Sequence, residues 1–395
     1  MSVVELALPG EDPFHLDDRL LQPFRQELEA LDGAAGAPGG GPPPPCRLAY
    51  AAAHLVMKAG YAAYGHSLER PGDPSEIASQ IDWETTFALR RRLAGHGFGI
   101  AEAMDTAQRY EIGWRIAERL IEGTGALRLA RGFVAGASTD HLEALLDPEQ
   151  VAEAWAWQAN RILAAGGTPV LLPQPALTAW KLDADAFVAA YRGAIERADG
   201  PLYLHWLGEM FHPAMRGYFP GDSLERVLAL DPQKVLGVKL SLLDAEQERQ
   251  IRRAIRPRGQ IVLTGDDLHF AELIGGDHSG DFSHALLGIF DAVAAPAGLA
   301  LRFLAHGRRG RYDELMAPCE RLGQAIFEAP TRHYKAGLAF LAWLNGWQDN
   351  PMLVNREDLA RDREHLLRVA RLASAAGCLE DAPLAAERLR AHSAA

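Results

Sequence analysis

The sequence predicts an α/β fold, a (β/α)8 TIM barrel with a C-terminal helical extension. Eight short apolar segments alternate with segments of helical spacing between residues 46 and 290, as eight parallel strands with intervening helices require. No glycine-rich phosphate-binding turn follows the first strand, which favours the barrel over an open doubly wound sheet. We therefore expect an N-terminal arm and linker (1–45), a barrel (46–290) and C-terminal helices (291–395).

The composition indicates an acidic protein with a large apolar core. The chain has 395 residues, of which 48% are apolar, and a net charge of -12. Nucleic acid and anionic membranes repel such a surface, so we expect neither as a partner. We find no signal-peptide pattern and no run near the roughly 20 apolar residues of a membrane span, and the three cysteines lack disulfide or zinc spacing. We expect a cytoplasmic protein with reduced thiols.

The arm contains one segment of helical spacing, residues 18–31, before a Gly/Pro-rich stretch at 33–45 that we predict to be a linker. A loop is expected at 61–79, and Asp82 is a suitable N-cap for the helix that follows it. The strands are expected at 47–56, 97–104, 130–135, 168–172, 201–206, 235–241, 260–264 and 280–285, the last from a weak pattern. Helices are expected at 83–93, 106–121, 184–196, 223–230 and 243–255, and helical segments interrupted at Pro148 are expected at 141–163. The helices of the extension are expected at 292–306, 312–327, 332–345 and 355–376.

Lys239 is the residue around which a function is inferred. It lies within the apolar run Val235–Ser241, where an unpaired ammonium would lose its solvation. Such a lysine is paired, reaches solvent, or serves chemistry that needs a neutral amine.

Working residues of a barrel follow the carboxyl ends of its strands. By that rule the candidates are His54, Glu102, Asp105, Ser138, Thr139, Asp140, Gln174, His205, Glu209, His212, Lys239, Ser241, Asp266, Asp267, His269, Ser283 and His284. This set is rich in acids and has one lysine at its centre, which suits an amine nucleophile that attacks a carbonyl and forms an imine.

Two motifs lie on the sixth and seventh predicted strands, Gly237-Val238-Lys239 and Leu263–Asp267. They resemble the Gly-Ile-Lys and Ser-Gly-Asp-Asp stretches of the dihydrodipicolinate synthase and N-acetylneuraminate lyase family, and we interpret the chain as a divergent bacterial branch of that family. Further similarity lies, in the same order as in the family, at 81–83, 132–139, 164–173, 325–330 and 334–336, so that roughly residues 46 to 378 are covered. The resemblance implies a lysine-dependent barrel with three C-terminal helices, often tetrameric, in which Lys239 forms the Schiff base.

Two departures from the family pattern bear on the substrate. Where the family has Gly-Thr-Thr-Gly-Glu to hold the carboxylate of an α-keto acid, this chain has Glu102 and Asp105, and like charges repel. We therefore expect a sugar-derived carbonyl compound rather than pyruvate. His205 takes the place of the family's catalytic tyrosine, and a histidine can move protons near neutral pH.

A competing interpretation is a metal-dependent sugar isomerase or epimerase. His205, Glu209 and His212 offer nitrogen and oxygen donors for a divalent metal ion, with neighbouring acids as further ligands. A third interpretation is a barrel that binds a ligand without turning it over.

The first hypothesis is a Schiff-base-forming lyase or aldolase that needs no cofactor and assembles as a dimer or tetramer. Lys239 is the predicted nucleophile, His205 the proton shuttle, and Asp266 a catalytic group that orients hydroxyls. The predicted substrate-binding residues are Glu102, Asp105, Ser138, Thr139, Gln174, Glu209, Gly265, Asp267 and His284. Asp266 and Asp267 are equally suited to capping the next helix, and Arg90, Arg91 and Arg92 are expected on a solvated helix face.

Overall fold

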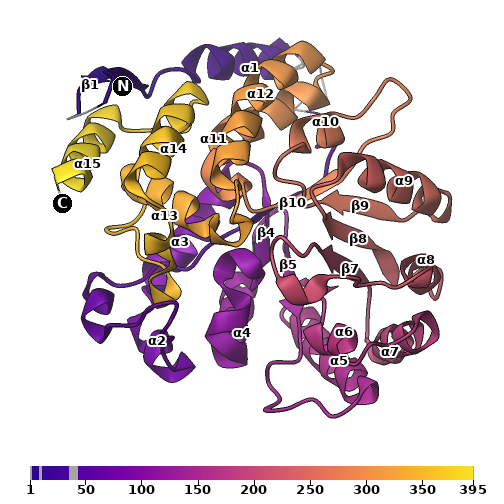
Figure 1. The fold of residues 1–395 in the computed structure, drawn as a ribbon. Coiled ribbons are helices and arrows are strands. Elements are labelled where there is room, and N and C mark those ends of the chain that lie inside the picture. The colour runs from indigo at the N-terminus through magenta and orange to yellow at the C-terminus, as the bar shows by residue number, and fades with distance from the viewer. Residues whose placement is uncertain (1, 9–10, 35–42, 395) are drawn as a thin grey trace. The chain divides into compact units, whose positions relative to one another are not determined.

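The computed structural model describes residues 2–8, 11–34 and 43–394, coloured along the chain in Figure 1. Most of the predicted linker, residues 35–42, lies outside the described residues. The chain forms two compact units, each made of several segments. The first comprises Met1–Leu48, His54–Phe98 and Ile289–Ala395, and the second comprises Ala49–Ala53 and Gly99–Gly288.

The second unit contains a closed barrel of eight parallel strands in the order β10-β3-β4-β5-β6-β7-β8-β9, which confirms the predicted fold class. Its strands are β3 (Ala49–Ala52), β4 (Gly99–Glu102), β5 (Phe133–Ala137), β6 (Thr168–Leu171), β7 (Leu202–Leu207), β8 (Val235–Ser241), β9 (Ile261–Thr264) and β10 (His284–Leu287).

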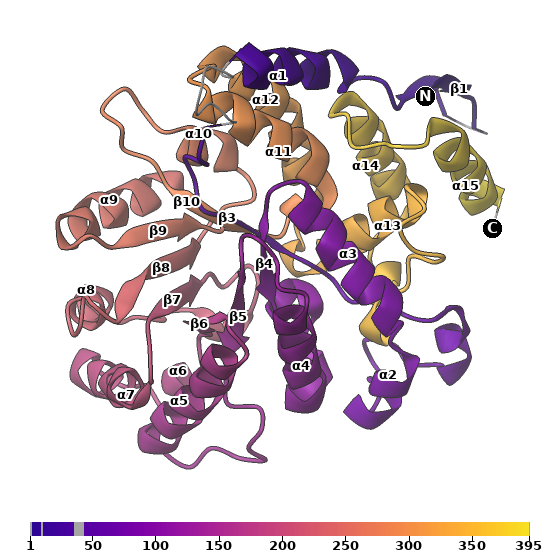
Figure 2. The same cartoon turned by 180° about the vertical axis from the view of Figure 1, so that it is seen from behind.

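Helices of the same unit lie outside these strands, as the view in Figure 2 shows for α5, α7, α8 and α9. They are α4 (Arg109–Ala126), α5 (Pro148–Ala164), α6 (Pro175–Ala179), α7 (Ala184–Arg197), α8 (Ser223–Leu228), α9 (Ala245–Ile255) and α10 (Phe270–Gly275), with short 3-10 turns η2 (Asp105–Ala107), η3 (Pro213–Met215) and η4 (Arg256–Arg258). Aspartate side chains cap α5, α7 and α9 by accepting a backbone N–H of the first turn.

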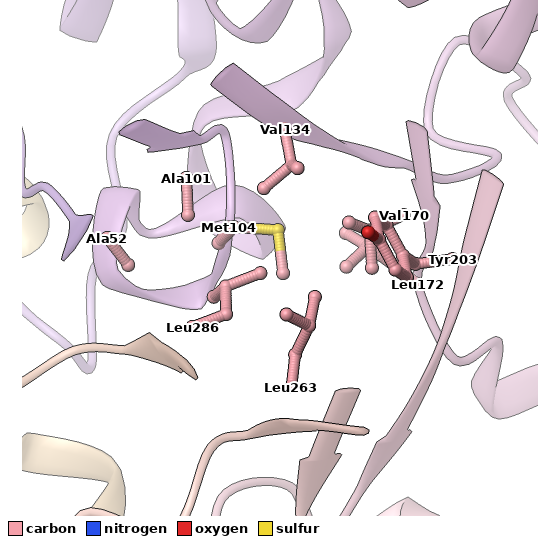
Figure 3. Close-up of a cluster of buried hydrophobic side chains, with 9 residues drawn as sticks. All are labelled: Ala52, Ala101, Met104, Val134, Val170, Leu172, Tyr203, Leu263 and Leu286. Carbon is pink, nitrogen blue, oxygen red and sulfur yellow. The ribbon is translucent and has the colours of Figure 1, made fainter. Parts of the chain in front are cut away.

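The barrel interior is filled by apolar side chains from successive strands (Figure 3). Nine buried residues form this cluster: Ala52, Ala101, Met104, Val134, Val170, Leu172, Tyr203, Leu263 and Leu286. Side chains alternate between the two faces of a strand. The residues directly before and after each interior position of a strand therefore point outward to the helices.

A β-bulge near the start of β8 sets the register with which the rest of this strand pairs with β7. Leu202 pairs with Val235 and Tyr203 with Gly237, so Leu236 is an extra residue, and beyond it His205 pairs with Lys239. Gly237 has φ 151°, and a Cβ there would lie 1.9 Å from the carbonyl oxygen of Ile261. Only glycine permits this approach of β8 to β9.

The first unit contains the arm and the C-terminal helices. A small antiparallel sheet of β1 (Val3–Leu6) and β2 (Phe14–Asp17) precedes α1 (Gln22–Ala34). The remaining elements are η1 (Ala59–Tyr64), α2 (Pro74–Gln80), α3 (Trp83–Gly95), α11 (Phe290–Ala305), α12 (Arg309–Ile326), η5 (Thr331–His333), α13 (Lys335–Leu344), η6 (Val354–Ala360), α14 (Arg363–Ala375) and α15 (Ala382–Ala394). None of the helices in the described ranges is long and apolar enough to cross a membrane.

Several element predictions were confirmed and others were wrong. Asp82 caps α3 as expected, accepting the backbone N–H of Thr85. The segment 61–79 is not a loop throughout, because η1 and α2 form there, and residues 141–147 are not helical because α5 begins only at Pro148. The eighth strand starts at His284, four residues later than predicted, because Gly280 and the acidic turn before it do not join the barrel.

We expect Gly237→Ala to lower the free energy of unfolding by on the order of 3 kcal/mol, because the added methyl group collides with the backbone of β9. Urea denaturation monitored by circular dichroism measures the loss. Gly310→Ala is the control, since nothing lies within 4 Å of a Cβ at that helical position. Equal stability of the two variants would contradict the steric role of Gly237.

Candidate active site in the barrel

Lys239 lies on β8 and is buried, with 8% of its surface exposed. Its register neighbours are His205 on β7 and Leu263 on β9, and Leu263 belongs to the barrel interior. A Cβ at Gly265 would lie 2.9 Å from Lys239 Cε and 2.3 Å from Ser241 Oγ. The absent side chain of Gly265 therefore leaves the room that the lysine occupies at the end of β9.

Opposing electrostatic effects act on the Lys239 amine. Burial is the larger effect and lowers its pKa to about 8, while the charges of Asp267 and Asp105 act in the opposite direction. A free lysine is almost fully protonated at neutral pH. Lys239 therefore has a much larger neutral, nucleophilic fraction, and two carboxylates near enough to stabilise a cationic product.

His205 is a neutral imidazole beside this amine. Burial, and then the charge of Lys239, hold the pKa of His205 well below its usual value. Its Nε2 lies 3.2 Å from Ser241 Oγ. Its Nδ1 is buried and has no hydrogen-bond partner among the described residues. A buried polar atom without a partner is costly, so this nitrogen is available to a hydroxyl or carbonyl of a bound ligand.

A second polar group follows β5 and β6. The Gln174 side chain donates to Thr139 Oγ1 at 2.5 Å, and its backbone N–H donates to the Tyr218 hydroxyl at 3.0 Å. Tyr218 lies in turn 2.8 Å from the Tyr191 hydroxyl. Ser138, the residue before Thr139, is buried, and its backbone N–H donates to Gln158 Oε1. The two tyrosines were missed from the sequence, since Tyr191 lies within a helix and no motif accompanies Tyr218.

Glu102, predicted to bind substrate, points away from the barrel interior. Ala101 belongs to the interior cluster, so the next residue faces the helices. The Glu102 carboxylate accepts the Thr124 hydroxyl of α4 at 2.7 Å and the N–H of Ala103 at 3.0 Å. Asp105 is thus the acid after β4 that acts on Lys239.

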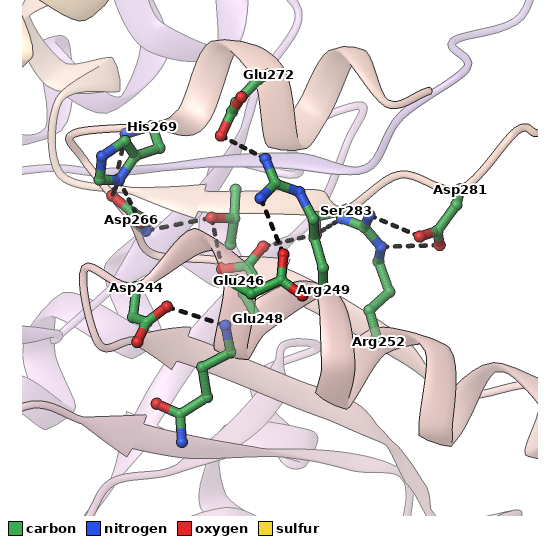
Figure 4. A network of polar contacts seen from close by, with 12 residues as sticks. Asp244, Glu246, Glu248, Arg249, Arg252, Asp266, His269, Glu272, Asp281 and Ser283 are labelled. Atoms are coloured by element: carbon green, nitrogen blue, oxygen red, sulfur yellow. Dashed lines mark hydrogen bonds and ion pairs between the residues drawn. The ribbon is translucent and has the colours of Figure 1, made fainter. Parts of the chain in front are cut away.

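The two aspartates that follow β9, Asp266 and Asp267, have different surroundings in the structure. Asp266 accepts the backbone N–H groups of Leu268 and His269, at 2.9 and 3.0 Å, and contacts the His269 ring. Figure 4 shows it within a polar network on the α9 side of β9. Its position is that of a turn cap, whereas Asp267 is the aspartate whose charge acts on Lys239.

Two further candidates lie elsewhere. His284 is the first residue of β10 instead of following its carboxyl end, so the rule that selected it does not apply. His54 belongs to the first unit, where its ring contacts Asp291 and lies 2.8 Å from Gln348 Oε1.

The residues of the competing metal interpretation are not assembled as a ligand set. Glu209 is exposed and forms an ion pair with Arg216, and His212 Nδ1 accepts the N–H of Ala214. Within the part of the chain that the structure describes, no three His, Cys, Asp or Glu side chains come together as metal ligands would.

Comparison with solved structures identifies the class of fold. Dihydrodipicolinate synthase from Oceanobacillus iheyensis matches with a TM-score of 0.58 and 14% identity, covering 82% of this chain and 95% of that one. The enzyme of the same name from Aquifex aeolicus matches at 0.58 and 12%, covering 84% and 100%. The Ruminococcus gnavus sialic acid aldolase matches at 0.55 and 15%, covering 83% and 97%. At such identities the likeness establishes the fold.

The family assignment comes from the sequence. Residues 26–395 match the family described as "Protein of unknown function (DUF993)", and the chain belongs to that family. A search of curated proteins gave no match. The barrel shared with the synthase and aldolase structures agrees with the fold that the motif resemblance implied.

Asp267→Asn is expected to lower the pKa of Lys239 further, because it removes the first of the charges that oppose burial. The rate of Lys239 labelling by an amine reagent, followed against pH by peptide mass spectrometry, measures this pKa. The wild-type midpoint should lie near pH 8. Glu209→Gln, outside this group, should leave the midpoint unchanged; an upward shift in Asp267→Asn would refute the assignment.

Buried Glu248 of α9 makes the stability of the fold depend on pH. Its carboxylate accepts the hydroxyls of Thr264 and Ser283, yet burial raises its pKa to about 7. The folded state therefore prefers the protonated form, and the stability that Glu248 contributes is highest below about pH 4.5 and falls as the pH rises through about 7. Glu248→Gln should gain about 3 kcal/mol relative to the wild type between pH 4.5 and pH 8.5.

Chemical denaturation across that pH range tests this prediction. The control is Glu246→Gln, which removes an exposed acid from the same helix. A stability difference between wild type and Glu248→Gln that does not vary with pH would show that Glu248 keeps its charge in the fold.

Proposed function

We propose that this protein is a Schiff-base-forming lyase of the class I aldolase type, with Lys239 as the nucleophile. The carrying observation is the buried amine at the end of β8, with a pKa of about 8 and two carboxylates acting on it. Lyases that work through an imine need a lysine with an appreciable neutral fraction and nearby groups that stabilise the cationic imine. The fold shared with dihydrodipicolinate synthase and sialic acid aldolase structures supports the proposal.

The proposed reaction begins when the neutral Lys239 amine adds to a substrate carbonyl. Loss of water then yields a protonated imine. A base takes the proton of the hydroxyl on the second carbon from the imine, the carbon–carbon bond between that carbon and the one next to the imine breaks, and the outer fragment leaves as a carbonyl compound. The electron pair of the broken bond enters the protonated imine and gives an enamine. Protonation of the carbon next to the imine and hydrolysis of the imine return the free lysine. Neutral His205, 3.2 Å from the Ser241 hydroxyl, is the proposed carrier of these protons.

The proposed substrate is a hydroxylated, sugar-derived carbonyl compound. A carboxylate beside the imine carbon would be repelled by Asp105 and Asp267, whose charges act on Lys239. Hydroxyl groups can instead donate to these acids and to the unpartnered Nδ1 of His205. Ser138, Thr139 and Gln174 add neutral hydrogen-bonding groups to the proposed site.

The remaining features of the proposal follow the resemblance. We propose that the reaction uses no metal or organic cofactor, that the chain acts in the cytoplasm, and that it assembles as a dimer or tetramer. Metal analysis of the active protein tests the absence of a metal, sedimentation analysis tests the oligomeric state, and cell fractionation tests the compartment.

Borohydride reduction in the presence of carbonyl compounds tests the lysine chemistry. With a panel of keto sugars, aldoses and keto acids, intact mass should show one adduct on the wild type and peptide mapping should place it on Lys239. Lys239→Ala should give none. Lys181→Arg removes an exposed primary amine of the same unit and should form as much reduced adduct as the wild type.

The outcomes separate the parts of the proposal. No adduct on the wild type, or an equal adduct on Lys239→Ala, would remove the imine chemistry. An adduct with pyruvate that exceeds those with hydroxylated carbonyl compounds would leave the chemistry and overturn the substrate class. His205→Asn should still form the adduct but lose about a hundredfold or more in turnover, the typical effect of a missing acid-base group.

A further inference from the structure

The first unit contains a cavity of about 400 Å³, a size typical of small-molecule sites. It is lined by residues of the arm, α3, α11 and the segment that follows α14: Asp18, Leu21, Arg25, Arg92, His96, Ala295, Gly377, Leu379 and Glu380. Gly298 of α11 permits the close packing of the wall, since a Cβ there would lie 2.4 Å from the His96 carbonyl oxygen. No barrel residue lines it.

Positive charge converges on this cavity. The pKa of Arg92 is lowered to about 10 by burial and by the charge of Arg25. Burial and the charges of Arg92 and Arg25 lower the pKa of His96 to about 4. The three side chains therefore lie close enough to disfavour one another's charge, an arrangement that costs free energy unless an anion joins them.

The carboxylates of the lining are already engaged. Asp18 accepts the Ser2 backbone amine at 2.5 Å and the Ala382 N–H at 3.1 Å. Glu380 forms an ion pair with Arg92 and accepts the Trp347 indole N–H at 3.3 Å. Arg25 forms no ion pair with any residue that the structure describes.

Arg92 is positioned more firmly than a surface arginine. Its guanidinium lies 4.1 Å from the centroid of the Trp347 ring. Its Nε is buried and lacks a hydrogen-bond partner among the described atoms. The expectation that Arg90, Arg91 and Arg92 form a solvated face was wrong for two of them: Arg90 is fully buried and bonds the His54 carbonyl oxygen, and Arg92 lines the cavity.

We propose that this cavity is a binding site for a small oxyanion, a phosphate or carboxylate group held between Arg25 and Arg92, with the neutral His96 ring as a further hydrogen-bonding group. A guanidinium presents paired N–H donors that match such a group. Exposed Arg25 and half-buried Arg92 would therefore supply two such sets of donors. The residues that line this cavity belong to the first unit and differ from those of the proposed barrel site. A bound anion would therefore contact the arm, α3 and the C-terminal helices.

Anion-dependent stability of the full chain tests the proposal. Thermal midpoints and titration calorimetry are measured with inorganic phosphate, malonate and chloride at constant ionic strength. Phosphate or malonate should raise the midpoint in a saturable manner, while chloride should not, and the more effective probe identifies which oxyanion chemistry the cavity prefers. Arg25→Gln should weaken this binding by about tenfold or more, the usual loss for one charge-assisted contact.

The controls locate the site. Arg19→Gln removes an exposed arginine that pairs only locally with Asp17, and it should bind like the wild type. Lys239→Ala should also bind like the wild type, which separates the cavity from the barrel amine. Absence of saturable stabilisation by both oxyanions, or equal affinity in Arg25→Gln and the wild type, would overturn the proposal. Arg25→Glu, at the same exposed position, should abolish binding and gives the same test by charge reversal.

Discussion

The desolvation of one amine, opposed by two carboxylates, is the interaction on which the proposed chemistry depends. Burial in the barrel lowers the pKa of Lys239 from 10.5 to about 8, a difference of about 3 kcal/mol between its two protonation states. Without Asp267 and Asp105 the charged form would be disfavoured further. With them, the site tolerates both a neutral nucleophile and a cationic imine, which an imine mechanism requires at different steps.

The arrangement of this site depends on strand register. The bulge at Leu236 and the absence of a side chain at Gly237 bring Lys239 level with His205, and Gly265 leaves room for the lysine chain. Strand alternation then decides which acids face it. Glu102 faces the helices and Asp266 caps a turn, so of the four acids that the sequence suggested, Asp105 and Asp267 are the two whose charges act on Lys239.

The first unit presents a different electrostatic problem. In the barrel, a single cation is balanced by acids, whereas in the cavity of the first unit Arg25 and Arg92 disfavour each other's charge, and among the described residues Glu380 pairs with Arg92 and not with Arg25. An external anion would resolve that imbalance. The residues involved come from the arm, α3 and the C-terminal segment, so such a ligand would hold together parts of the unit that are distant in sequence.

The alternation of barrel strands and helices, the barrel class and the place of Lys239 on a buried strand were readable in the sequence, because period-two and period-3.6 patterns and helix caps such as Asp82 are local properties. The start of β10, the Tyr191–Tyr218–Gln174 chain and the burial of Arg90 were not, because each depends on contacts between distant segments. Chain order placed Asp266 and Asp267 side by side. The closed barrel fixes the direction of each side chain and removes water from around Lys239. These two effects decide that Asp267 is the aspartate that acts on the amine.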